Sequence, residues 1–385
     1  MNVLTYLGID ESTLEKYISD KLIDRAHHEE FPLALLCYSR KAVYDNVWDS
    51  VTTKCRGLIY CTDTMEIIAR PFEKFHNYGS EQITPEESAF VFTAGEPEIY
   101  EKLDGFLCIL YEWEGKQYIA SKGSFHSVHA KWATRWLNKR GPISGPKDST
   151  FVFEGITKNL RIVVDYGAAE ELRLLACINN ETGEEFNYPE LRFIAYMYNL
   201  SMAQQFTYTM QEVLSDANSG RQNFEGYVLL WRRPGQTPFR LKVKYLEYLR
   251  LHRVVTQVSP KRILEALSQG WDSVLAEYVE NSTPEFKKYA EKWKGYLENE
   301  YNTIFVRVEK TFNIVREELD APPYGRQLPN RKQWADYFTC NQWKDISGAL
   351  FAYLDGNMNQ VRAIIWKMLK NKVVGAKPLV DAHNT

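Results

Sequence analysis

The chain has 385 residues, of which 44% are hydrophobic and 25% are charged, as in an ordinary globular protein. This length allows two or three domains of about 100–200 residues each. No apolar run approaches the roughly 20 residues that span a bilayer, and the acidic N-terminus lacks the basic start of a secretory signal. Six scattered cysteines show no paired or metal-ligand spacing. We therefore expect a cytoplasmic protein (host-cell cytoplasm for a viral source) with no membrane partner.

The net charge of −3 is divided unevenly along the chain. Residues 1–249 carry 27 Lys+Arg against 34 Asp+Glu, which gives −7, and residues 250–385 carry 20 against 16, which gives +4. A basic C-terminal part is compatible with a polyanionic partner. An excess of four charges is too small to establish nucleic-acid binding by itself.

Up to about residue 250 the sequence predicts short strands separated by Gly, Pro and Asp, with helices near residues 11–20, 127–139 and 188–199. Most connections are too short for parallel crossovers, so we expect an α+β domain with largely antiparallel pairing. The predicted strands are Pro32–Tyr38, Gly57–Cys61, Ile67–Ala69, Phe106–Tyr111, Gln117–Ser121, Phe151–Glu154, Leu172–Cys177, Gly226–Trp231 and Phe239–Val243.

After about residue 255 the spacing of apolar residues becomes helical, which predicts domains at residues 1–254 and 255–385. Ser259 and Thr283 each precede a proline, as an N-cap precedes the first residue of a helix. Aromatic residues up to Phe312 recur mostly every three or four positions, as on the buried side of a long helix. The remaining predicted elements are a proline-rich turn at Asp320–Pro329 and helices at Asn330–Phe338, Gln342–Tyr353 and Asn357–Lys370.

A charged motif, Lys102-Leu103-Asp104-Gly105, stands directly before the apolar run Phe106–Tyr111. A lysine held against a buried strand has a partly desolvated ammonium group, which lowers its pKa and frees the amine to attack. The alternative is a lysine at a strand end whose charge reaches water.

Two further charged patterns stand at strand ends. Lys242 and Lys244 alternate with apolar residues, so both ammonium groups lie on one strand face, about 7 Å apart. They repel each other unless an anion such as phosphate lies between them. The alternative is an edge strand whose lysines prevent it from pairing with the edge of another chain. Glu154 and Glu225 border apolar strands and suit a sugar hydroxyl or a divalent cation, although a solvated strand end has the same pattern.

K-x-D-G, a strand glutamate, E-G and K-x-K follow one another from Lys102 to Lys244. This ordered set resembles the covalent nucleotidyltransferases, which comprise DNA ligases, RNA ligases and mRNA-capping enzymes. The stretches CRG, RPFEKFHN, SKGS, TKNLRIVVDY and LKVKYLEYLRLH are similar to signature stretches of the T4-type RNA ligase 1 family. The similarity covers roughly residues 35–255. It implies an ATP-grasp-like nucleotidyltransferase domain followed by an all-helical C-terminal domain.

The resemblance also implies roles for individual residues. Lys102 would attack the α-phosphorus of ATP and carry AMP, and basic neighbours would lower its pKa. Glu154 would bind the ribose hydroxyls, and Glu225 would bind the catalytic metal, Mg²⁺ or Mn²⁺. The other implied nucleotide contacts are Lys242 and Lys244 at the α-phosphate, Arg56, Lys74 and Lys122 at the outer phosphates or the water shell of a second metal, Leu175 and Val228 beside the adenine, and Glu101, Asp104 and Gly105 in the nucleophile motif. His76 stands where the family can carry an aromatic residue.

The implied activity is that of an ATP-dependent RNA ligase. It would join 5′-phosphate and 3′-hydroxyl ends through lysyl-AMP and RNA-adenylate, in the repair of RNA such as tRNA. We expect a monomer whose C-terminal domain selects the RNA, with a separate end-healing kinase and phosphatase as a partner. DNA ligases and capping enzymes follow K-x-K with a strand-rich OB domain, whereas this chain becomes helical. The alternatives are a DNA-joining or GTP-using relative and a catalytically silent protein that binds RNA ends.

Overall fold

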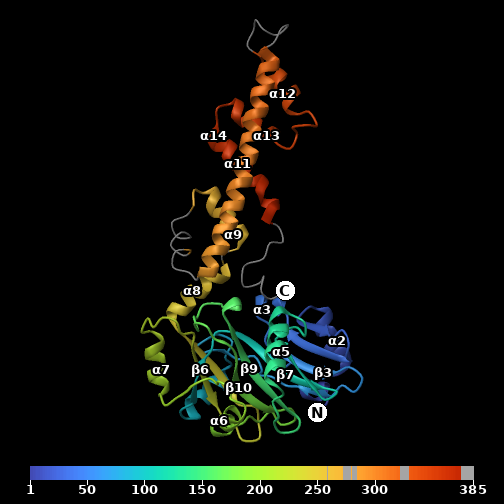
Figure 1. Cartoon of the computed structure of the whole chain (residues 1–385), viewed down its shortest axis with the longest axis vertical. Coiled ribbons are helices and arrows are strands. Elements are labelled where there is room, and N and C mark those ends of the chain that lie inside the picture. Colours follow the sequence, from blue (N-terminus) through green and yellow to red (C-terminus); the bar gives the residue numbers. More distant parts are fainter. Residues whose placement is uncertain (258, 272–278, 280–283, 321–328, 374–385) are drawn as a thin grey trace. The chain divides into compact units, whose positions relative to one another are not determined.

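The structure is a computed structural model that describes residues 1–257, 259–271, 279, 284–320 and 329–373. The chain forms two compact units (Figure 1). The N-terminal unit comprises Met1–His252, and the helical unit begins at Arg253. All strands of the described residues lie in the N-terminal unit. The predicted α+β class and the helical C-terminal part are therefore confirmed.

Three sheets build the N-terminal unit, with strand orders β1-β2-β3-β4, β10-β9-β7-β8 and β11-β6-β12-β13-β5. Their strand pairs are antiparallel except for β5 with β13. The strands are β1 (Ile23–His27), β2 (Leu33–Tyr38), β3 (Arg56–Cys61), β4 (Ile67–Ala69), β5 (His76–Asn77), β6 (Glu98–Lys102), β7 (Phe106–Trp113), β8 (Lys116–Ser121), β9 (Ser149–Thr157), β10 (Glu170–Asn179), β11 (Gln205–Phe206), β12 (Gly226–Trp231) and β13 (Phe239–Lys244).

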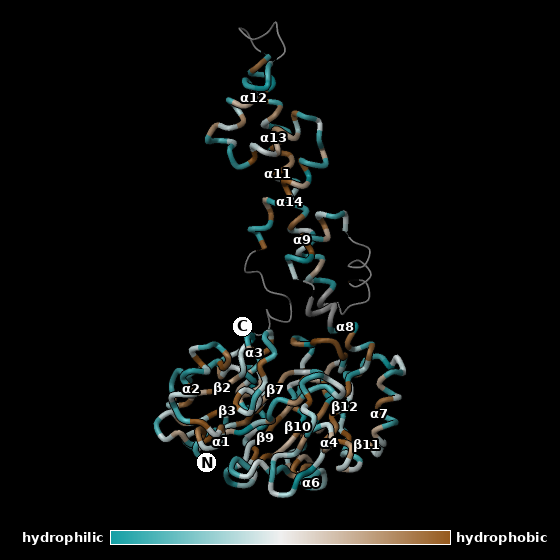
Figure 2. The backbone as a smooth tube through the Cα atoms, turned by 180° about the vertical axis from the view of Figure 1, so that it is seen from behind, coloured by the Kyte–Doolittle hydropathy of each residue, from teal (hydrophilic) through white to brown (hydrophobic). Residues whose placement is uncertain are grey.

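The central four-stranded sheet is buried on both faces. Alternating residues of β7 and β9 point to opposite sides, so Ile109 and Val152 pack against strands β2 and β3, while Leu110 and Phe153 pack against helices. Figure 2 shows the hydrophobic colour running through these strands. The helices of this unit are α1 (Val3–Leu7), α2 (Glu11–Ser19), α3 (Arg40–Tyr44), α4 (Pro85–Thr93), α5 (Val128–Arg140), α6 (Tyr188–Met197), α7 (Met210–Ala217) and the beginning of α8 (Leu246–Gln257).

Each strand predicted from the sequence is present, within a few residues at its ends. The prediction missed β6, and this omission affects the site. Lys102 was expected to stand at the start of the apolar strand β7, but it is the last residue of β6, in a different sheet. The sequence of β6, EIYEK, carries charge at three of its five positions and only Ile99 is fully buried. Its hydrophobic signal is therefore too weak to predict a strand.

The helical unit packs short helices along one long helix. Val308 and Val315 of the long helix form a buried core with Trp334, Phe338 and Leu350. The predicted N-cap at Ser259 is confirmed by its side-chain bond to a backbone N–H group, and Asn330, predicted as the first residue of a helix, caps α12 in the same way. Helix α13 starts at Ser347 instead of Gln342. The helices are α9 (Pro260–Ser268), α11 (Pro284–Asp320), α12 (Arg331–Phe338), α13 (Ser347–Leu354) and α14 (Met358–Met368).

The predicted cap at Thr283 and most of the predicted turn at Asp320–Pro329 lie outside the described residues. Within the described part of the chain, no helix is both long and apolar enough to cross a membrane.

Candidate active site

Strand pairing alone brings three motif residues to one place. Gly226, the first residue of β12, pairs with Lys102 at the end of β6 and with Lys244 at the end of β13. Glu225 directly precedes this glycine, so its carboxylate lies between the two lysines. A Cβ atom on Gly226 would lie 2.0 Å from the carbonyl oxygen of Val243. The strands can therefore approach this closely only with glycine at position 226.

Glu225 accepts hydrogen bonds from both ammonium groups. Its Oε2 lies 2.8 Å from Nζ of Lys102, and its Oε1 lies 2.8 Å from Nζ of Lys244. The glutamate side chain is only 4% exposed, while the lysine side chains are 20% and 16% exposed. Each group of this buried triad depends on the others for compensation of its charge.

The pKa of Lys102 is raised, which contradicts the prediction that basic neighbours lower it. Burial alone would lower this pKa, but the carboxylates of Glu225 and Glu154 outweigh burial. Burial alone would raise the pKa of Glu225, but Lys102 and then Lys244 hold it below its ordinary value. The prediction was wrong because the sequence does not reveal that Glu225 separates the two ammonium groups. Without a bound substrate or metal, Lys102 therefore carries a positive charge.

Two other lysines, Lys242 and Lys74, have a lowered pKa. Burial, followed by the charges of Lys74 and Lys102, lowers the pKa of Lys242 to about 7. Burial, followed by Arg56 and Lys122, lowers the pKa of Lys74 to about 8. These shifts mark a crowded group of cations without enough negative charge between them. An anion such as a polyphosphate would relieve this repulsion.

Aromatic rings hold these cations in place, and the sequence prediction missed this feature. The ring of Phe75 lies 5.7 Å from Cζ of Arg56 and 5.5 Å from Nζ of Lys242. Nζ of Lys74 lies 4.5 Å from the ring of Trp48. Phe75 was part of the quoted stretch RPFEKFHN, but Trp48 stands in a segment with no motif. These rings restrict the basic side chains while leaving their hydrogen-bond donors available.

Two further cations add to this group. Nη1 of Arg56 is buried and has no hydrogen-bond partner within the part of the chain that is described. A buried guanidinium donor without an acceptor is expected where a ligand supplies one. Lys122 is exposed, and its Nζ lies 3.5 Å from the hydroxyl of Tyr38 and 4.8 Å from the ring.

His76 also lies near this group, with its ring 5.8 Å from that of Trp48 in an edge-to-face arrangement. Burial, followed by Lys74 and Lys242, lowers the pKa of His76 to about 4, so the ring is neutral at physiological pH.

Glu154 reaches the loop Leu103–Gly105, which follows Lys102, from the other sheet. It lies on β9, and its Oε1 accepts a hydrogen bond of 3.0 Å from the N–H of Gly105. A Cβ atom on Gly105 would lie 2.3 Å from the carbonyl oxygen of Gly155, so the loop requires glycine to approach β9. Burial raises the pKa of Glu154 to about 7, although Lys102 opposes this shift.

Asp104 is a positioning residue, since protein groups occupy both of its carboxylate oxygens. Oδ2 accepts from the N–H groups of Val163 and Val164 at 2.8 and 2.7 Å, and Oδ1 accepts from the hydroxyl of Tyr248 at 2.8 Å. The N–H of Asp104 donates to the hydroxyl of Tyr166 at 2.8 Å. The carboxylate thus ties the loop Leu103–Gly105 to the TKNLRIVVDY segment and to α8. Tyr248, within LKVKYLEYLRLH, was not predicted as a site residue.

The remaining predicted residues lie on strands of the two sheets that carry Glu154 and Lys102. Val228 pairs with Lys242 in the five-stranded sheet. Leu175 lies at a β-bulge of β10, where the pairing with β9 shifts by one residue. The N–H of Glu101 donates to the carbonyl of Gln204 at 2.7 Å.

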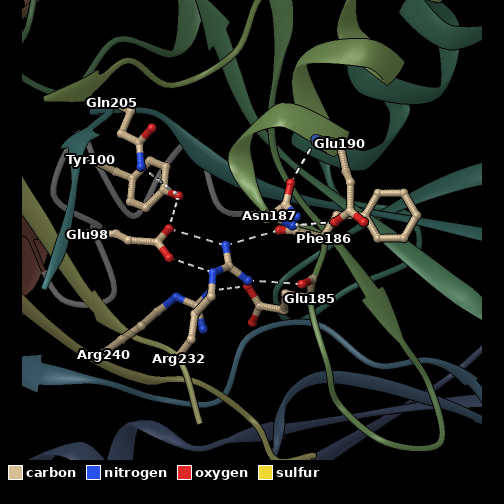
Figure 3. A network of polar contacts seen from close by, with 9 residues as sticks. All are labelled: Glu98, Tyr100, Glu185, Phe186, Asn187, Glu190, Gln205, Arg232 and Arg240. Atoms are coloured by element: carbon tan, nitrogen blue, oxygen red, sulfur yellow. Dashed lines mark hydrogen bonds and ion pairs between the residues drawn. The ribbon is translucent and has the colours of Figure 1, made fainter. Parts of the chain in front are cut away.

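A second network holds the five-stranded sheet against the connection after β10 (Figure 3). Arg232 donates to Glu98 at 2.6 and 3.3 Å, and to two backbone carbonyls of that connection. The hydroxyl of Tyr100, two residues before Lys102, donates to Glu98 at 2.5 Å. Arg240 forms a buried ion pair with Glu185 of the connection. These contacts fix the spacing of the two sheets that carry the site.

Replacing Glu154 with glutamine should make stability less dependent on pH. The folded carboxyl has a pKa of about 7, above its ordinary value of 4.5, so the native state binds this proton more tightly than the unfolded state does. The contribution of Glu154 to the free energy of unfolding should therefore fall as pH rises from about 4.5 to about 7, by on the order of 1–3 kcal/mol. The glutamine side chain of the Glu154→Gln variant keeps an oxygen for Gly105 but does not titrate. Urea denaturation across this range compares the two proteins, and equal pH slopes would contradict the shift.

Comparison with known proteins identifies similar chains among viral RNA ligases. The chain is 22% identical, over an alignment 395 positions long, to an RNA ligase of Rhodothermus phage RM378, covering 83% of this chain and 85% of that protein. It is 26% identical over 242 residues to a protein of Autographa californica nuclear polyhedrosis virus named as a polynucleotide kinase/RNA ligase. That match covers 57% of this chain and spans only 34% of the baculovirus protein.

Solved structures of low similarity carry related names. An archaeal ATP-dependent RNA ligase matches with a TM-score of 0.43 and 15% identity, covering 81% of each chain. A Naegleria gruberi RNA ligase mutant with ATP and Mn matches with a TM-score of 0.33 and 14% identity, covering 45% of this chain and 55% of the other.

The family assignment rests on a separate match. The T4 RNA ligase 1 family model, described as RNA ligase, matches residues 54–248, which is just over half of the chain. This range contains the K-x-D-G motif at Lys102, both glutamates and the K-x-K strand. The chain therefore belongs to the T4-type RNA ligase family.

Proposed function

We propose that the protein is an ATP-dependent RNA ligase that works through a covalent lysyl-AMP. Nζ of Lys102 forms a bond to the α-phosphorus of ATP, the bond to the pyrophosphate oxygen breaks, and the amine loses a proton to solvent. An oxygen of the RNA 5′-phosphate then attacks the same phosphorus and breaks the P–N bond, which restores the lysine. The 3′-hydroxyl of the second end attacks the activated 5′-phosphorus, and AMP leaves.

The convergence of Lys102, Glu225 and the cation group carries this proposal. Phosphoryl-type transfer depends mainly on positioning and on cations placed where oxygens gather charge. Lys242 and Arg56 are such cations, because burial and crowding lower the pKa of Lys242 and Nη1 of Arg56 is buried without a hydrogen-bond partner among the described residues. The proposed nucleophile lies at the same strand ends as Lys244.

The raised pKa of Lys102 sets a requirement for the first step. The ammonium must leave Glu225 and lose its proton before the amine can attack. Engagement of Glu225 by another cation would remove the main group that favours the charged lysine. The nearby charge of Lys244 would then lower the pKa of Lys102. The buried triad therefore keeps the nucleophile inactive until substrate binding rearranges it.

The donor set fits a magnesium-type ion. Such an ion takes one or two carboxylates and completes its shell with waters and substrate phosphates. Glu225 would offer such a carboxylate once Lys102 leaves it, since Lys102 and Lys244 otherwise occupy its two oxygens. Asp104 is a weaker candidate, because backbone N–H groups and the hydroxyl of Tyr248 use both of its oxygens. In the described part of the chain no group of three or more His, Cys, Asp or Glu residues could hold a metal alone. When bound, Mg²⁺ or Mn²⁺ would neutralise phosphate charge.

We propose that the helical unit selects the RNA substrate, of which tRNA is one example. A separate end-healing kinase and phosphatase would act on the RNA ends before the ligase. The mild positive charge of the helical unit and its position beyond the family match support its role in this selection. Joining assays on several RNAs, with the full chain and with a chain ending at His252, would separate nucleotide transfer from RNA choice.

Two assays test the proposed activity. Incubation with ATP labelled at the α-phosphorus and Mg²⁺ should transfer label to the protein. Addition of RNA carrying 5′-phosphate and 3′-hydroxyl ends should then give joined RNA. Transfer of label to the protein from GTP instead of ATP would support a GTP-using relative. Joining of nicked DNA but not of RNA would support a DNA-joining relative. RNA binding without label or joining would support a silent end-binding protein and would end the ligase proposal.

A further inference from the structure

A tract without negative charge runs from residue 115 to residue 147. No Asp or Glu stands between Glu114 and Asp148, although residues 1–249 as a whole are acidic. The tract contains β8, the SKGS stretch and the whole of α5. Its seven basic residues are Lys116, Lys122, Lys131, Arg135, Lys139, Arg140 and Lys147.

Three of these cations form a stripe along α5. Lys131, Arg135 and Lys139 are four residues apart, so they lie on one side of the helix and extend over about 12 Å at 1.5 Å per residue. All three are exposed, while Ala133 and Leu137 on the other side are buried. None of the three forms an ion pair within the described residues. The helix lies against β8 and β7 (Figure 1).

Helix stability does not account for this stripe. Like charges four residues apart destabilise a helix by about 0.2–0.5 kcal/mol per pair. Lys139 in the last turn interacts favourably with the helix dipole, but Lys131 lies close to the N-terminus, where a cation is unfavourable. A face that only contacts water would gain from carboxylates at these positions. The arrangement instead suits a partner with regularly spaced negative charge.

Two tryptophans border the stripe. Trp132 and Trp136 are half-buried, and their indole N–H groups donate to Glu170 at 3.2 Å and 3.0 Å, to its side chain and its carbonyl respectively. Cζ of Arg140 lies 5.0 Å from the ring of Trp136. Aromatic rings held beside cations are the usual surface for unpaired bases of single-stranded RNA.

The helix starts at the proposed active site. The hydroxyl of Ser127, its N-cap, donates to Oγ of Ser121 at 2.9 Å, and Lys122 directly follows Ser121. The ring of His129 lies 4.4 Å from that of Phe106, which directly follows the loop Leu103–Gly105. The stripe therefore leads away from the loop that follows Lys102, along a continuous element.

We propose that α5 binds the phosphate backbone of single-stranded RNA next to the end being joined. Lys131, Arg135 and Lys139 contact successive phosphates, and the tryptophans contact bases. This inference rests on the proposed ligase function, because it assigns a substrate surface to that site. It differs from the role proposed for the helical unit, since it concerns the strand close to the reacting ends in the N-terminal unit.

The test compares two double variants that each remove two positive charges. The test variant combines Lys131→Gln with Lys139→Gln and so removes two charges of the stripe. The control variant combines Lys16→Gln in α2 with Lys21→Gln just after it, and both of these lysines are exposed. Binding of a short single-stranded RNA is measured by fluorescence anisotropy at several salt concentrations. The logarithm of the association constant falls linearly with the logarithm of the salt concentration, and each lost phosphate contact makes this slope shallower by about 0.7. The slope of the stripe variant should therefore be shallower by about 1.4, and that of the control should be unchanged. Affinity at low salt should fall about tenfold.

Further readouts keep the outcomes separate. Transfer of label from ATP to Lys102 without RNA tests the ligase proposal alone, and it should proceed in both variants. If the unmodified chain takes no label but the slopes still differ, the ligase proposal fails while α5 remains an RNA surface. Equal slopes for both variants would overturn the inference. Loss of binding to anionic lipid vesicles, with RNA binding unchanged, would also overturn it. If the double variant does not fold, Arg135→Gln should still lower the slope by about 0.7.

Discussion

Lys102→Ala should abolish transfer of AMP to the protein and, with it, the joining of RNA. Removal of the nucleophile in a covalent mechanism leaves no alternative route, so the rate should fall by more than about 10⁴-fold. The measurement is the amount of label bound to the protein after incubation with ATP labelled at the α-phosphorus. Label at the level of the unmodified chain would show that another residue is the nucleophile.

Lys102→Arg is the matched control for this result. The guanidinium keeps a positive charge near Glu225, so the buried ion pair and the fold persist, but its pKa is too high for it to act as a nucleophile. We therefore expect no label and near-normal stability. A Lys102→Arg variant that takes label would contradict the assignment of the reacting amine.

Glu225→Gln should destabilise the protein by about 3–5 kcal/mol in free energy of unfolding. The side chain is 4% exposed and accepts from two ammonium groups at 2.8 Å each. The amide has only one acceptor oxygen, so at least one buried lysine loses its partner. Urea denaturation near pH 7 measures the effect. The loss should shrink above about pH 9, because the unpaired lysine then releases its proton.

Glu247→Gln provides the control for removing a paired carboxylate. Glu247 pairs with Arg250 on α8 at 2.8 Å, and the arginine side chain is 42% exposed. Because exposed pairs contribute little, this change should alter the free energy of unfolding by less than about 0.5 kcal/mol. A similar loss in both variants would show that the triad around Glu225 has no special stabilising effect.

Much of the fold could be predicted from the sequence because most of its strands are short apolar runs bounded by Gly, Pro or Asp. Strand β12 (GYVLLW) is such a run, whereas strand β13 (FRLKVK) was predicted from its strict alternation of apolar and basic residues. Strand β6 was missed, since its charged residues mask the alternation that identifies strands. The antiparallel register that joins Lys102 to Gly226 and Lys244 is a long-range property that local patterns do not contain.

The electrostatics of the site could be predicted only in part. The ordered motifs indicated that lysines and glutamates gather, but not which groups form pairs. Glu225 takes both Lys102 and Lys244, so the lowered pKa values belong to Lys74 and Lys242. The aromatic residues that hold the cations, such as Trp48, come from segments without a motif. Pairings of this kind depend on distances of a few ångströms, which follow from the packing of three sheets.

Mass spectrometry of the protein after incubation with ATP and Mg²⁺ tests the covalent mechanism most directly. Digestion and peptide mapping should find the mass of one AMP on the peptide that contains Lys102, and treatment with pyrophosphate should remove it. An AMP adduct on a different residue, or joined RNA without any adduct on the enzyme, would contradict the assignment of Lys102 as the residue that carries AMP.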